Sequence, residues 1–155
     1  MRIGFGFDAH ELVNAKPLKL GGITVDFPKG LQGHSDGDVL LHSLADAILG
    51  ACAGGDIGMF FRDNDQNIKG IDSKEILNFA LKTAHASNLS LTSIDIVVVA
   101  DKPKLNTLYN SLRESISGLC NIPPQRVSVK SKTTEGTTVN EDAIACYSVV
   151  LMEEL

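Results

Sequence analysis

The sequence predicts a single α+β domain, with helices packed on one face of a mixed four-stranded sheet and a hairpin near the N-terminus. Three observations predict the fold of the single chain. Alternating apolar segments typical of strands occur near both ends of the 155-residue chain. Amphipathic repeats typical of helices fill much of the middle. The length suits one domain with one core, so residues 1–155 are expected to form one unit.

The first strand is expected at IGFGFDAH, where apolar side chains fall on one face and Gly4, Gly6 and Asp8 fall on the other. If the extended conformation continues, His10 shares the face of Asp8. The segment LKLGGITVDF then predicts a hairpin, because its Gly-Gly pair accepts positive φ without steric cost.

Three helices are expected next. The first begins near Ser35 or Asp36, with Ser35 and Asp38 spaced as a capping pair, and ends toward the Gly-Gly pair at 54–55. The second runs from about Ser73 to Ser87. A third can open at Pro103, and a Pro-Pro pair at 123–124 prevents its continuation.

Strands are expected between and after these helices. SIDIVVVAD is rich in β-branched residues and reads as a central strand. RVSVKSKTTE and AIACYSVVLME supply two final alternating strands. Strands and helices of these lengths fit a mixed sheet with helices on one face.

Composition excludes several classes of function. The net charge of −5, with no basic run, disfavours nucleic acid and anionic membranes as partners. Three cysteines without CxxC spacing argue against a disulfide framework or a thiolate zinc site. No apolar run approaches the roughly 20 residues that span a bilayer, and the first residues do not resemble a signal peptide, so a cytoplasmic location is expected.

The first candidate site combines Asp8 and His10 of the first strand with His42 of the first helix. Two nitrogens and one carboxylate form a known zinc donor set, and three protein ligands leave a position open for substrate. Asp38 and Asp46, one turn away on each side of His42, could orient its ring. Each of these residues could instead be an ordinary surface or hydrogen-bonded core residue.

Two further clusters are candidates for ligand binding. The first comprises Lys130 and residues 132–135, whose hydroxyls, ammonium groups and loop amides are suited to bind phosphate. Glu135 could share a hard cation such as Mg²⁺ with that phosphate. In DIGMFFRDND, Asp56, Asp63 and Asp65 could bind the hydroxyl groups of a polyol. A simple turn and an acidic surface loop remain the alternatives.

The sequence also closely resembles the 2-C-methyl-D-erythritol 2,4-cyclodiphosphate synthases. The matching pieces occur in order over nearly the whole chain: RIGFGFDAH, a turn at GG, KGLQGHSDGDVLLHSLADAILGA, GDIGMFF with DND and KGIDS, ADKPKL, VKSKTTE and AIAC. One segment departs from the pattern, because GTTVNED stands where the family usually has a longer glycine-rich stretch with an Arg and a Phe. Val139 could take the place of the aromatic residue.

The resemblance implies specific roles. The zinc ligands would be Asp8, His10 and His42, and Glu135 would bind a second cation, Mg²⁺ or Mn²⁺, with the substrate diphosphate. Catalysis would depend on His34 and on Thr133, which steadies the transition state. The substrate contacts would include Asp8, His10, His34, Ser35, Asp56, Ile57, Gly58, Phe61, Asp63, Asp65, Ala100, Pro103, Lys104, Leu105, Asn106, Lys132, Thr133, Thr134 and Glu135.

The reaction that the resemblance implies is an intramolecular phosphoryl transfer. A cytidine diphosphate ester of methylerythritol 2-phosphate would close to the 2,4-cyclodiphosphate and release CMP, in non-mevalonate isoprenoid biosynthesis. The family forms a homotrimer with active sites between subunits. Two other functions stay open: a metal-dependent phosphoesterase or nucleotidyl hydrolase that uses water, and a trimeric cytidine-nucleotide or zinc-binding module without turnover.

Overall fold

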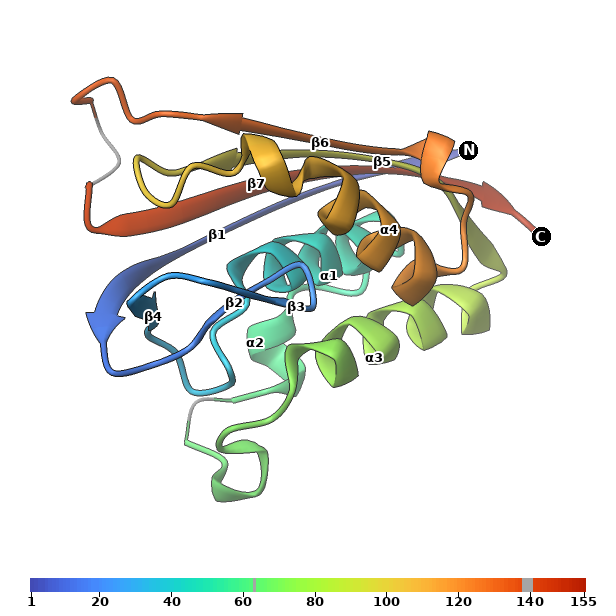
Figure 1. Ribbon diagram of the computed structural model, residues 1–155. Coiled ribbons are helices and arrows are strands. Elements are labelled where there is room, and N and C mark those ends of the chain that lie inside the picture. Colours follow the sequence, from blue (N-terminus) through green and yellow to red (C-terminus); the bar gives the residue numbers. More distant parts are fainter. Residues whose placement is uncertain (63, 138–140) are drawn as a thin grey trace.

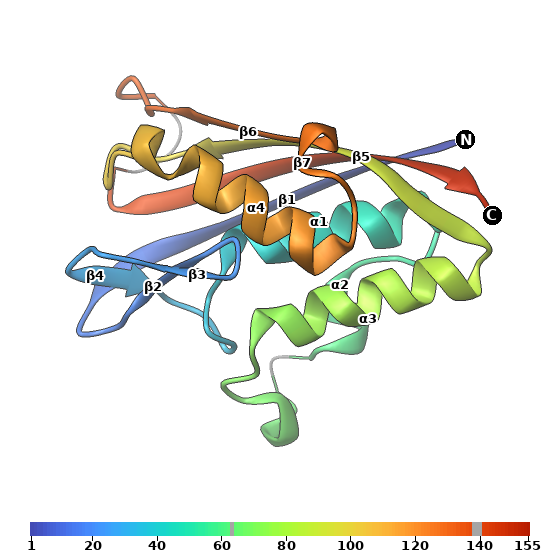
Figure 2. The same cartoon turned by 45° about the vertical axis from the view of Figure 1, so that its right-hand side comes forward.

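A computed structural model describes residues 1–62, 64–137 and 141–155. Its helices lie on one face of a long, twisted sheet, and Figures 1 and 2 show the two layers. The strands are β1 (Arg2–Asn14), β2 (Leu18–Leu20), β3 (Ile23–Val25), β4 (Lys29–Leu31), β5 (Leu89–Val99), β6 (Val127–Lys132) and β7 (Ala143–Glu154). The α-helices are α1 (Val39–Ala51), α2 (Ile57–Phe60), α3 (Ser73–Ala86) and α4 (Tyr109–Cys120).

The main sheet has the strand order β4-β1-β7-β5-β6, and β5 and β6 form its parallel pair. The predicted mixed sheet is therefore confirmed, but the predicted count of four strands is wrong. The fifth strand, β4, pairs with the end of β1 through Leu12↔Leu31, Val13↔Gly30 and Asn14↔Lys29. Three residues are too few to show the alternation that marks a strand in sequence.

The predicted hairpin is confirmed as β2 and β3. Leu20 pairs with Ile23, and the intervening Gly21 and Gly22 have φ values of 59° and 80°. Positive φ at both central residues belongs to the tight turn that joins two antiparallel strands. The side chains of Leu18, Leu20 and Val25 are buried, so the hairpin closes one end of the core.

Two helix starts differ from the prediction. Helix α1 begins at Val39, and Asp38 is itself the N-cap, accepting a hydrogen bond from the Leu41 amide. Helix α4 begins at Tyr109 after a short 3-10 turn, whereas Pro103 lies in the preceding loop and follows a cis peptide bond. The second helix matches its prediction, because α3 spans Ser73–Ala86 with Asp72 as N-cap. Tertiary contacts decide such ends more than local propensity does.

The packing of α1 on β1 is unusually close. A Cβ atom on Gly4 would lie 1.7 Å from the Ala47 carbonyl oxygen, and one on Gly6 would lie 1.9 Å from that of Ser43. The backbone of α1 fills the space beside these two glycines, because neither has a side chain that would keep the helix away. Glycine allows two backbones to approach this closely, and the approach brings the first strand and the first helix together along their length.

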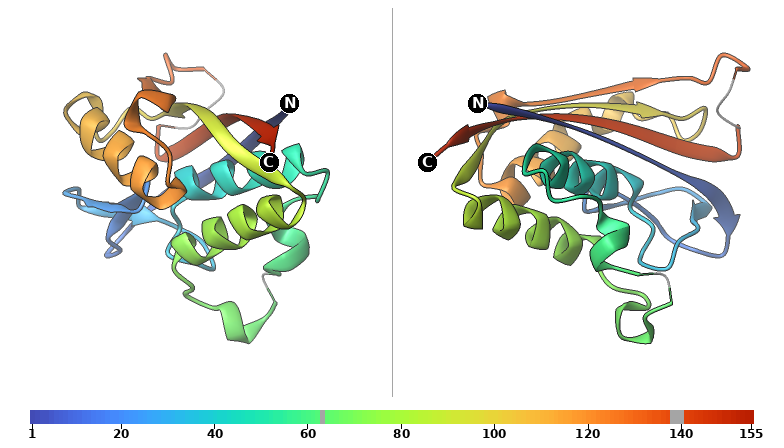
Figure 3. Two further views of the ribbon diagram at one scale, coloured as in Figure 1. Left: turned by 90° about the vertical axis from the view of Figure 1, so that its right-hand side faces the viewer. Right: turned by 180° about the vertical axis from the view of Figure 1, so that it is seen from behind.

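No α-helix formed by the described residues covers the opposite face of the sheet (Figures 1 and 3). Large apolar side chains are exposed there on β1 and β7: Ile3 is 70% exposed, Phe5 62%, Phe7 48%, Tyr147 37% and Val149 42%. Phe7 and Tyr147 contact each other with ring centroids 4.9 Å apart. A contiguous apolar surface of this kind is typical of an interaction face.

Candidate active site

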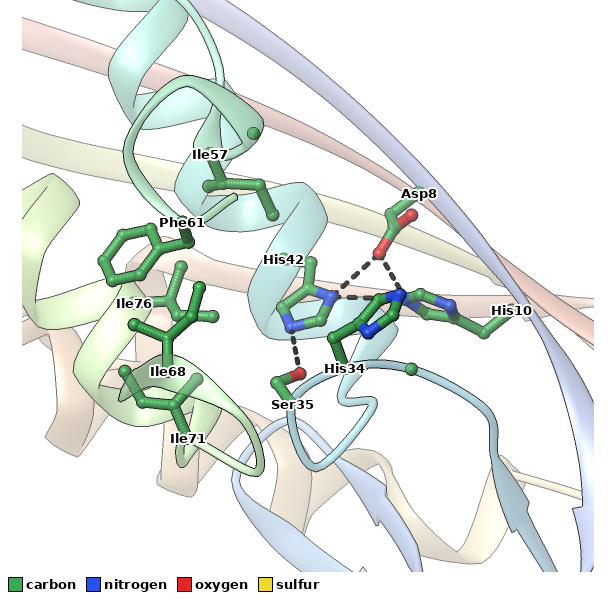
Figure 4. Close-up of a pocket in the computed structure, with 12 residues that line it drawn as sticks. Asp8, His10, His34, Ser35, His42, Ile57, Phe61, Ile68, Ile71 and Ile76 are labelled. Carbon is green, nitrogen blue, oxygen red and sulfur yellow. Dashed lines mark hydrogen bonds and ion pairs between the residues drawn. The ribbon is translucent and has the colours of Figure 1, made fainter. Parts of the chain in front are cut away.

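The three predicted metal ligands meet at one point. Strand β1 presents Asp8 and His10, and helix α1 presents His42 (Figure 4). The Asp8 Oδ2 atom lies 2.8 Å from His10 Nε2 and 2.9 Å from His42 Nδ1, and the two ring nitrogens are 3.2 Å apart. Side chains 34 positions apart in sequence thus converge because the glycines of β1 admit α1.

The size of this triangle fits a zinc ion. An ion bound at about 2.0–2.2 Å by three ligands of a tetrahedron holds those ligand atoms roughly 3.3 Å apart. The observed separations of 2.8 to 3.2 Å are only slightly shorter. Among the described residues, these three form the one group of His, Cys, Asp or Glu side chains close enough to hold a metal. These three side chains therefore form the candidate metal centre.

The charge state of Asp8 also suits a ligand. Burial by itself would raise its pKa, but hydrogen bonds and electrostatic interactions with His10 and His42 lower it well below the ordinary value. The carboxylate is therefore ionised at neutral pH. Its second oxygen, Oδ1, accepts a hydrogen bond from the Ala9 amide, which fixes its orientation.

The other ring nitrogen of His42 faces two serine hydroxyls. Nε2 lies 2.9 Å from Ser73 Oγ and 3.0 Å from Ser35 Oγ. The expectation that Asp38 and Asp46 orient this ring is wrong, since in the described structure both carboxylates accept from backbone amides and neither bonds the His42 ring. The one hydrogen bond from His42 to Asp38 joins backbone atoms. Their spacing along the helix suggested a role that their side-chain directions do not allow.

Asp38 and Asp46 instead fix loops to helix α1. The Asp38 carboxylate accepts hydrogen bonds from the amides of Gly21, Gly22 and Leu41 at 2.7–3.1 Å. Burial raises the pKa of Asp38, and these amides partly offset the shift. Asp46 Oδ1 accepts from the Ile57 amide at 2.7 Å, which ties the start of α2 to α1.

A pocket opens beside the metal triad (Figure 4). One side is polar and the other is apolar. Its lining contains Asp8, His10, Gly33, His34, Ser35, His42, Ile57, Gly58, Phe61, Ile68, Ile71 and Ile76. The structure thus brings eight predicted site residues together: Asp8, His10, His34, Ser35, His42, Ile57, Gly58 and Phe61.

The acidic residues of the predicted polyol cluster lie differently. Asp56 is the N-cap of α2, and its side chain accepts from the Met59 amide. Asp65 lines a second, smaller hollow with His34, Gln66, Ile68 and Lys69. Asp63 and Val139 lie outside the described residues.

The remaining predicted residues gather at another edge of the molecule, where β5 and β6 end. Asp101 joins the two segments, because its carboxylate accepts from the Thr134 amide at 2.9 Å and from the Thr134 hydroxyl at 2.7 Å. Thr133 donates to Glu135. The side chains of Lys104, Asn106, Lys132, Thr133 and Glu135 are exposed, whereas Ala100, Leu105 and Thr134 are buried and Pro103 is half-buried.

Neither of these segments lines the pocket beside the metal triad. Lys130 was expected to belong to the phosphate-binding cluster, but its ammonium group pairs with Asp95 Oδ2 at 2.6 Å. The predicted site is therefore divided within one chain into two described regions.

Sequence reasoning missed several residues of the pocket and its support. Ile68, Ile71 and Ile76 form its apolar wall, but apolar residues around a helix start usually signal core. Ser73 was recognised only as the first residue of a helix. Its full burial next to Asp36 is a tertiary property with no signature in local sequence.

Known proteins resemble the chain over its whole length. A model of the YgbB family matches residues 1–153. A 2-C-methyl-D-erythritol 2,4-cyclodiphosphate synthase of Carboxydothermus hydrogenoformans is 44% identical over 157 residues, covering 100% of this chain and 96% of that protein. The Geobacter sulfurreducens protein of the same name is 45% identical over 156 residues, covering 99% of each.

Solved structures also resemble this chain. A CDP-bound form of 2C-methyl-D-erythritol-2,4-cyclodiphosphate synthase superposes with a TM-score of 0.92 at 36% identity, covering 98% of this chain and 100% of that one. The IspF protein of Plasmodium falciparum in its CDP complex gives a TM-score of 0.85 at 33% identity, covering 99% and 96%. The chain therefore belongs to the YgbB family, and the relatives compared with it are 2-C-methyl-D-erythritol 2,4-cyclodiphosphate synthases.

Proposed function

We propose that this chain converts 4-diphosphocytidyl-2-C-methyl-D-erythritol 2-phosphate to 2-C-methyl-D-erythritol 2,4-cyclodiphosphate and CMP, as a lyase of non-mevalonate isoprenoid biosynthesis. The observation that carries the proposal is the convergence of Asp8, His10 and His42 beside a pocket, in a chain 44% identical to a named synthase over its full length. The CDP-bound structural relatives support a cytidine nucleotide as part of the ligand.

In this reaction, an oxygen of the 2-phosphate forms a bond to the β-phosphorus of the diphosphate. The bond between that phosphorus and the bridging oxygen breaks, and CMP leaves with the bonding electrons. Because two anionic groups must approach each other, the barrier is dominated by repulsion and misalignment. The chain therefore has to neutralise and orient, and no side-chain nucleophile is required.

Asp8, His10 and His42 would hold Zn²⁺, and Glu135 would hold Mg²⁺ or Mn²⁺ at the diphosphate. Bound divalent cations draw charge from phosphate oxygens and align the reacting groups. His34 and Ser35 would contact phosphate oxygens next to the triad, and both already line the pocket. Thr133 would donate a hydrogen bond to the phosphate in the transition state.

The other predicted contacts divide between the two ends of the substrate. Ile57, Gly58 and Phe61, with Asp56, Asp63 and Asp65 from the same loops, would surround the methylerythritol group. The segment 100–106 would hold cytosine, with Ala100, Pro103, Leu105 and Asn106 at the base and Lys104 at the nucleotide phosphates. Lys132 and Thr134 would complete the phosphate contacts around Thr133.

The proposal includes a homotrimer whose active sites lie between subunits. Two observations support an assembly: the exposed apolar face of β1 and β7, and the division of the predicted site into two regions of one chain. If the regions of neighbouring subunits face each other, each site is completed by its neighbour. Sedimentation equilibrium should give three chains per particle, and a stable, active monomer would exclude this part of the proposal.

The test of function is phosphorus NMR of the purified protein with the cytidyl substrate, Zn²⁺ and Mg²⁺. The expected products are the cyclic diphosphate and CMP in equal amounts. Methylerythritol 2,4-bisphosphate, which carries two separate phosphate monoesters, would instead indicate a hydrolase that uses water. Bound CDP without any turnover would indicate a binding module.

A further inference from the structure

The two ring nitrogens of His42 have different surroundings. Nδ1 points toward Asp8 and His10, and Nε2 points away from them toward Ser73 and Ser35 (Figure 4 draws Ser35). A histidine that binds a cation through one nitrogen must present a lone pair there, so the proton lies on the other nitrogen. The residue that accepts that proton's hydrogen bond therefore selects the tautomer that can bind a metal.

Ser73 is placed to be that acceptor. Its hydroxyl donates to Asp36 Oδ1, so its only hydrogen is directed at a carboxylate. The oxygen lone pairs are left for His42 Nε2, at 2.9 Å. The Asp36 carboxylate is itself held, because Oδ2 accepts from the Ser73 amide at 3.3 Å and Oδ1 from the Asp38 amide at 3.2 Å.

Ser35 has a different position. Its side chain lines the substrate pocket, and its oxygen already accepts from the Gly37 amide at 3.1 Å. Ser73 is fully buried and does not line the pocket, so it cannot serve as a substrate contact. A buried hydroxyl between a carboxylate and a ring nitrogen acts through the histidine.

We propose that Ser73 and Asp36 form a positioning pair that orients His42, so that its Nδ1 lone pair faces the metal triad. The chain of hydrogen bonds runs from His42 Nε2 to Ser73 Oγ and from Ser73 Oγ to Asp36. The proposal rests on the proposed function only in taking Asp8, His10 and His42 as the ligands of a divalent cation. It assigns roles to two residues outside the predicted site.

The pair also links the metal triad to the loop that precedes α3. The Asp36 amide donates to the Ile71 carbonyl oxygen at 3.1 Å, and Ile71 is part of the apolar wall of the pocket. Asp36 thus contacts both the loop that carries Ser35 and the segment that carries Ile71 and Ser73. Orientation of His42 depends on these two segments staying together.

The experiment measures Zn²⁺ affinity of metal-free protein by competition with a chromophoric chelator, and the visible spectrum of the Co²⁺-loaded form. Neither readout requires turnover. The variants are Ser73→Ala, Ser73→Thr and Asp36→Asn. Ser148→Ala is the matched control, since Ser148 is also fully buried and its hydroxyl bonds Ser43 Oγ at 2.7 Å rather than a side chain of the metal triad.

Loss of an outer hydrogen-bond partner of a metal-bound histidine typically weakens metal binding about 10- to 100-fold. Ser73→Ala should therefore bind Zn²⁺ about 10-fold or more weakly and change the Co²⁺ spectrum. Ser73→Thr, which keeps the hydroxyl, should recover most of the affinity. Asp36→Asn should give a smaller loss, about threefold, because an amide oxygen accepts less strongly than a carboxylate. Ser148→Ala should bind as the wild type does.

Unchanged zinc affinity and an unchanged Co²⁺ spectrum in folded Ser73→Ala would overturn the proposal. So would an equal loss in Ser148→Ala, which would indicate a general effect of removing a buried hydroxyl. If Ser73→Ala does not fold, Asp36→Asn decides: wild-type affinity overturns the proposal and a loss supports it. If the wild type binds zinc and the variants lose affinity as expected, but no cyclic product forms, the proposed function is contradicted and the role of Ser73 and Asp36 is supported.

Discussion

The pocket beside the metal triad and the edge formed by residues 100–106 and 132–135 are built in different ways. In the pocket, the donor atoms of Asp8, His10 and His42 lie within 3.2 Å of one another. At the edge, Thr134 is held by Asp101, but the side chains of Lys104 and Glu135 are exposed. The first region is organised by contacts among its own side chains, while the second presents exposed charged groups to a ligand.

The largest effect should follow from removing a ligand in the organised region. His42→Ala should abolish stoichiometric zinc binding and lower kcat/KM by about 10³-fold or more, because the cation there is needed to neutralise the reacting phosphates. Metal analysis and the phosphorus NMR assay check this. The control is His85→Ala, which removes an exposed histidine from the last turn of α3. This variant should change neither zinc binding nor kcat/KM. Full activity in His42→Ala would show that the triad is not part of the site.

The next effect concerns how this region is built. Gly6→Ala places a Cβ where only 1.9 Å separates it from the Ser43 carbonyl oxygen, so β1 and α1 must move apart. We expect a loss of about 3 kcal/mol in the free energy of unfolding, together with weaker zinc binding. Urea denaturation measures the first quantity.

The control for this variant is Gly118→Ala in α4. A Cβ atom on Gly118 meets nothing within 4 Å, so this variant should gain about 0.5–1 kcal/mol from helix propensity. Equal stability of the two variants would mean that the close contact of β1 with α1 relaxes at little cost.

A smaller, different effect is expected at the exposed edge. Glu135→Gln should lower kcat/KM about 10- to 30-fold and raise the Mg²⁺ concentration needed for activity, because a hard cation prefers a carboxylate. Zinc content should stay at the wild-type level. Glu141→Gln, an exposed acid nearby, is the control. Loss of zinc from Glu135→Gln would mean that the two regions are not independent.

The smallest effect should come from the ion pair of Asp95 and Lys130 on β5 and β6. Partial burial acts to raise the pKa of Asp95, but hydrogen bonds and the charge of Lys130 lower it overall. A lowered pKa stabilises the folded state above the ordinary value of 3.8, and this contribution is lost as the pH falls through the lowered value.

Asp95→Asn should therefore cost less than about 1 kcal/mol at pH 7 and almost nothing near pH 2, since the pair is exposed. Urea denaturation at both pH values checks the difference. A cost that grows as the pH falls would contradict the assigned direction of the pKa shift.

The two regions also differ in how far their residues could be predicted. Asp8 and His10 share a face because a strand alternates, and His42 follows from an amphipathic helix, so local periodicity was enough to propose the triad. Their convergence was confirmed, although which elements touch depends on packing. Ser73 and β4 were not found, because a buried hydroxyl and a three-residue pairing leave no pattern.

The predicted role of Asp38 and Asp46 in orienting His42 shows what helical spacing alone does not predict. Helical spacing correctly placed both acids one turn from His42. It did not show that the hairpin turn at Gly21 and Gly22 would supply amides to Asp38, or that Ile57 would supply one to Asp46. Partners brought in from distant segments decide what a polar side chain on a helix contacts.

The contact of Gly4 and Gly6 with the backbone of α1 has a consequence for how freely this chain can vary. Because main-chain atoms meet there, the spacing between the strand and the helix does not depend on which apolar side chains fill the rest of the core. Substitutions among the buried leucines can then change stability while the ligand geometry is preserved. Gly4 and Gly6, which have no side chains, thus keep the geometry of the metal ligands independent of sequence changes in the core.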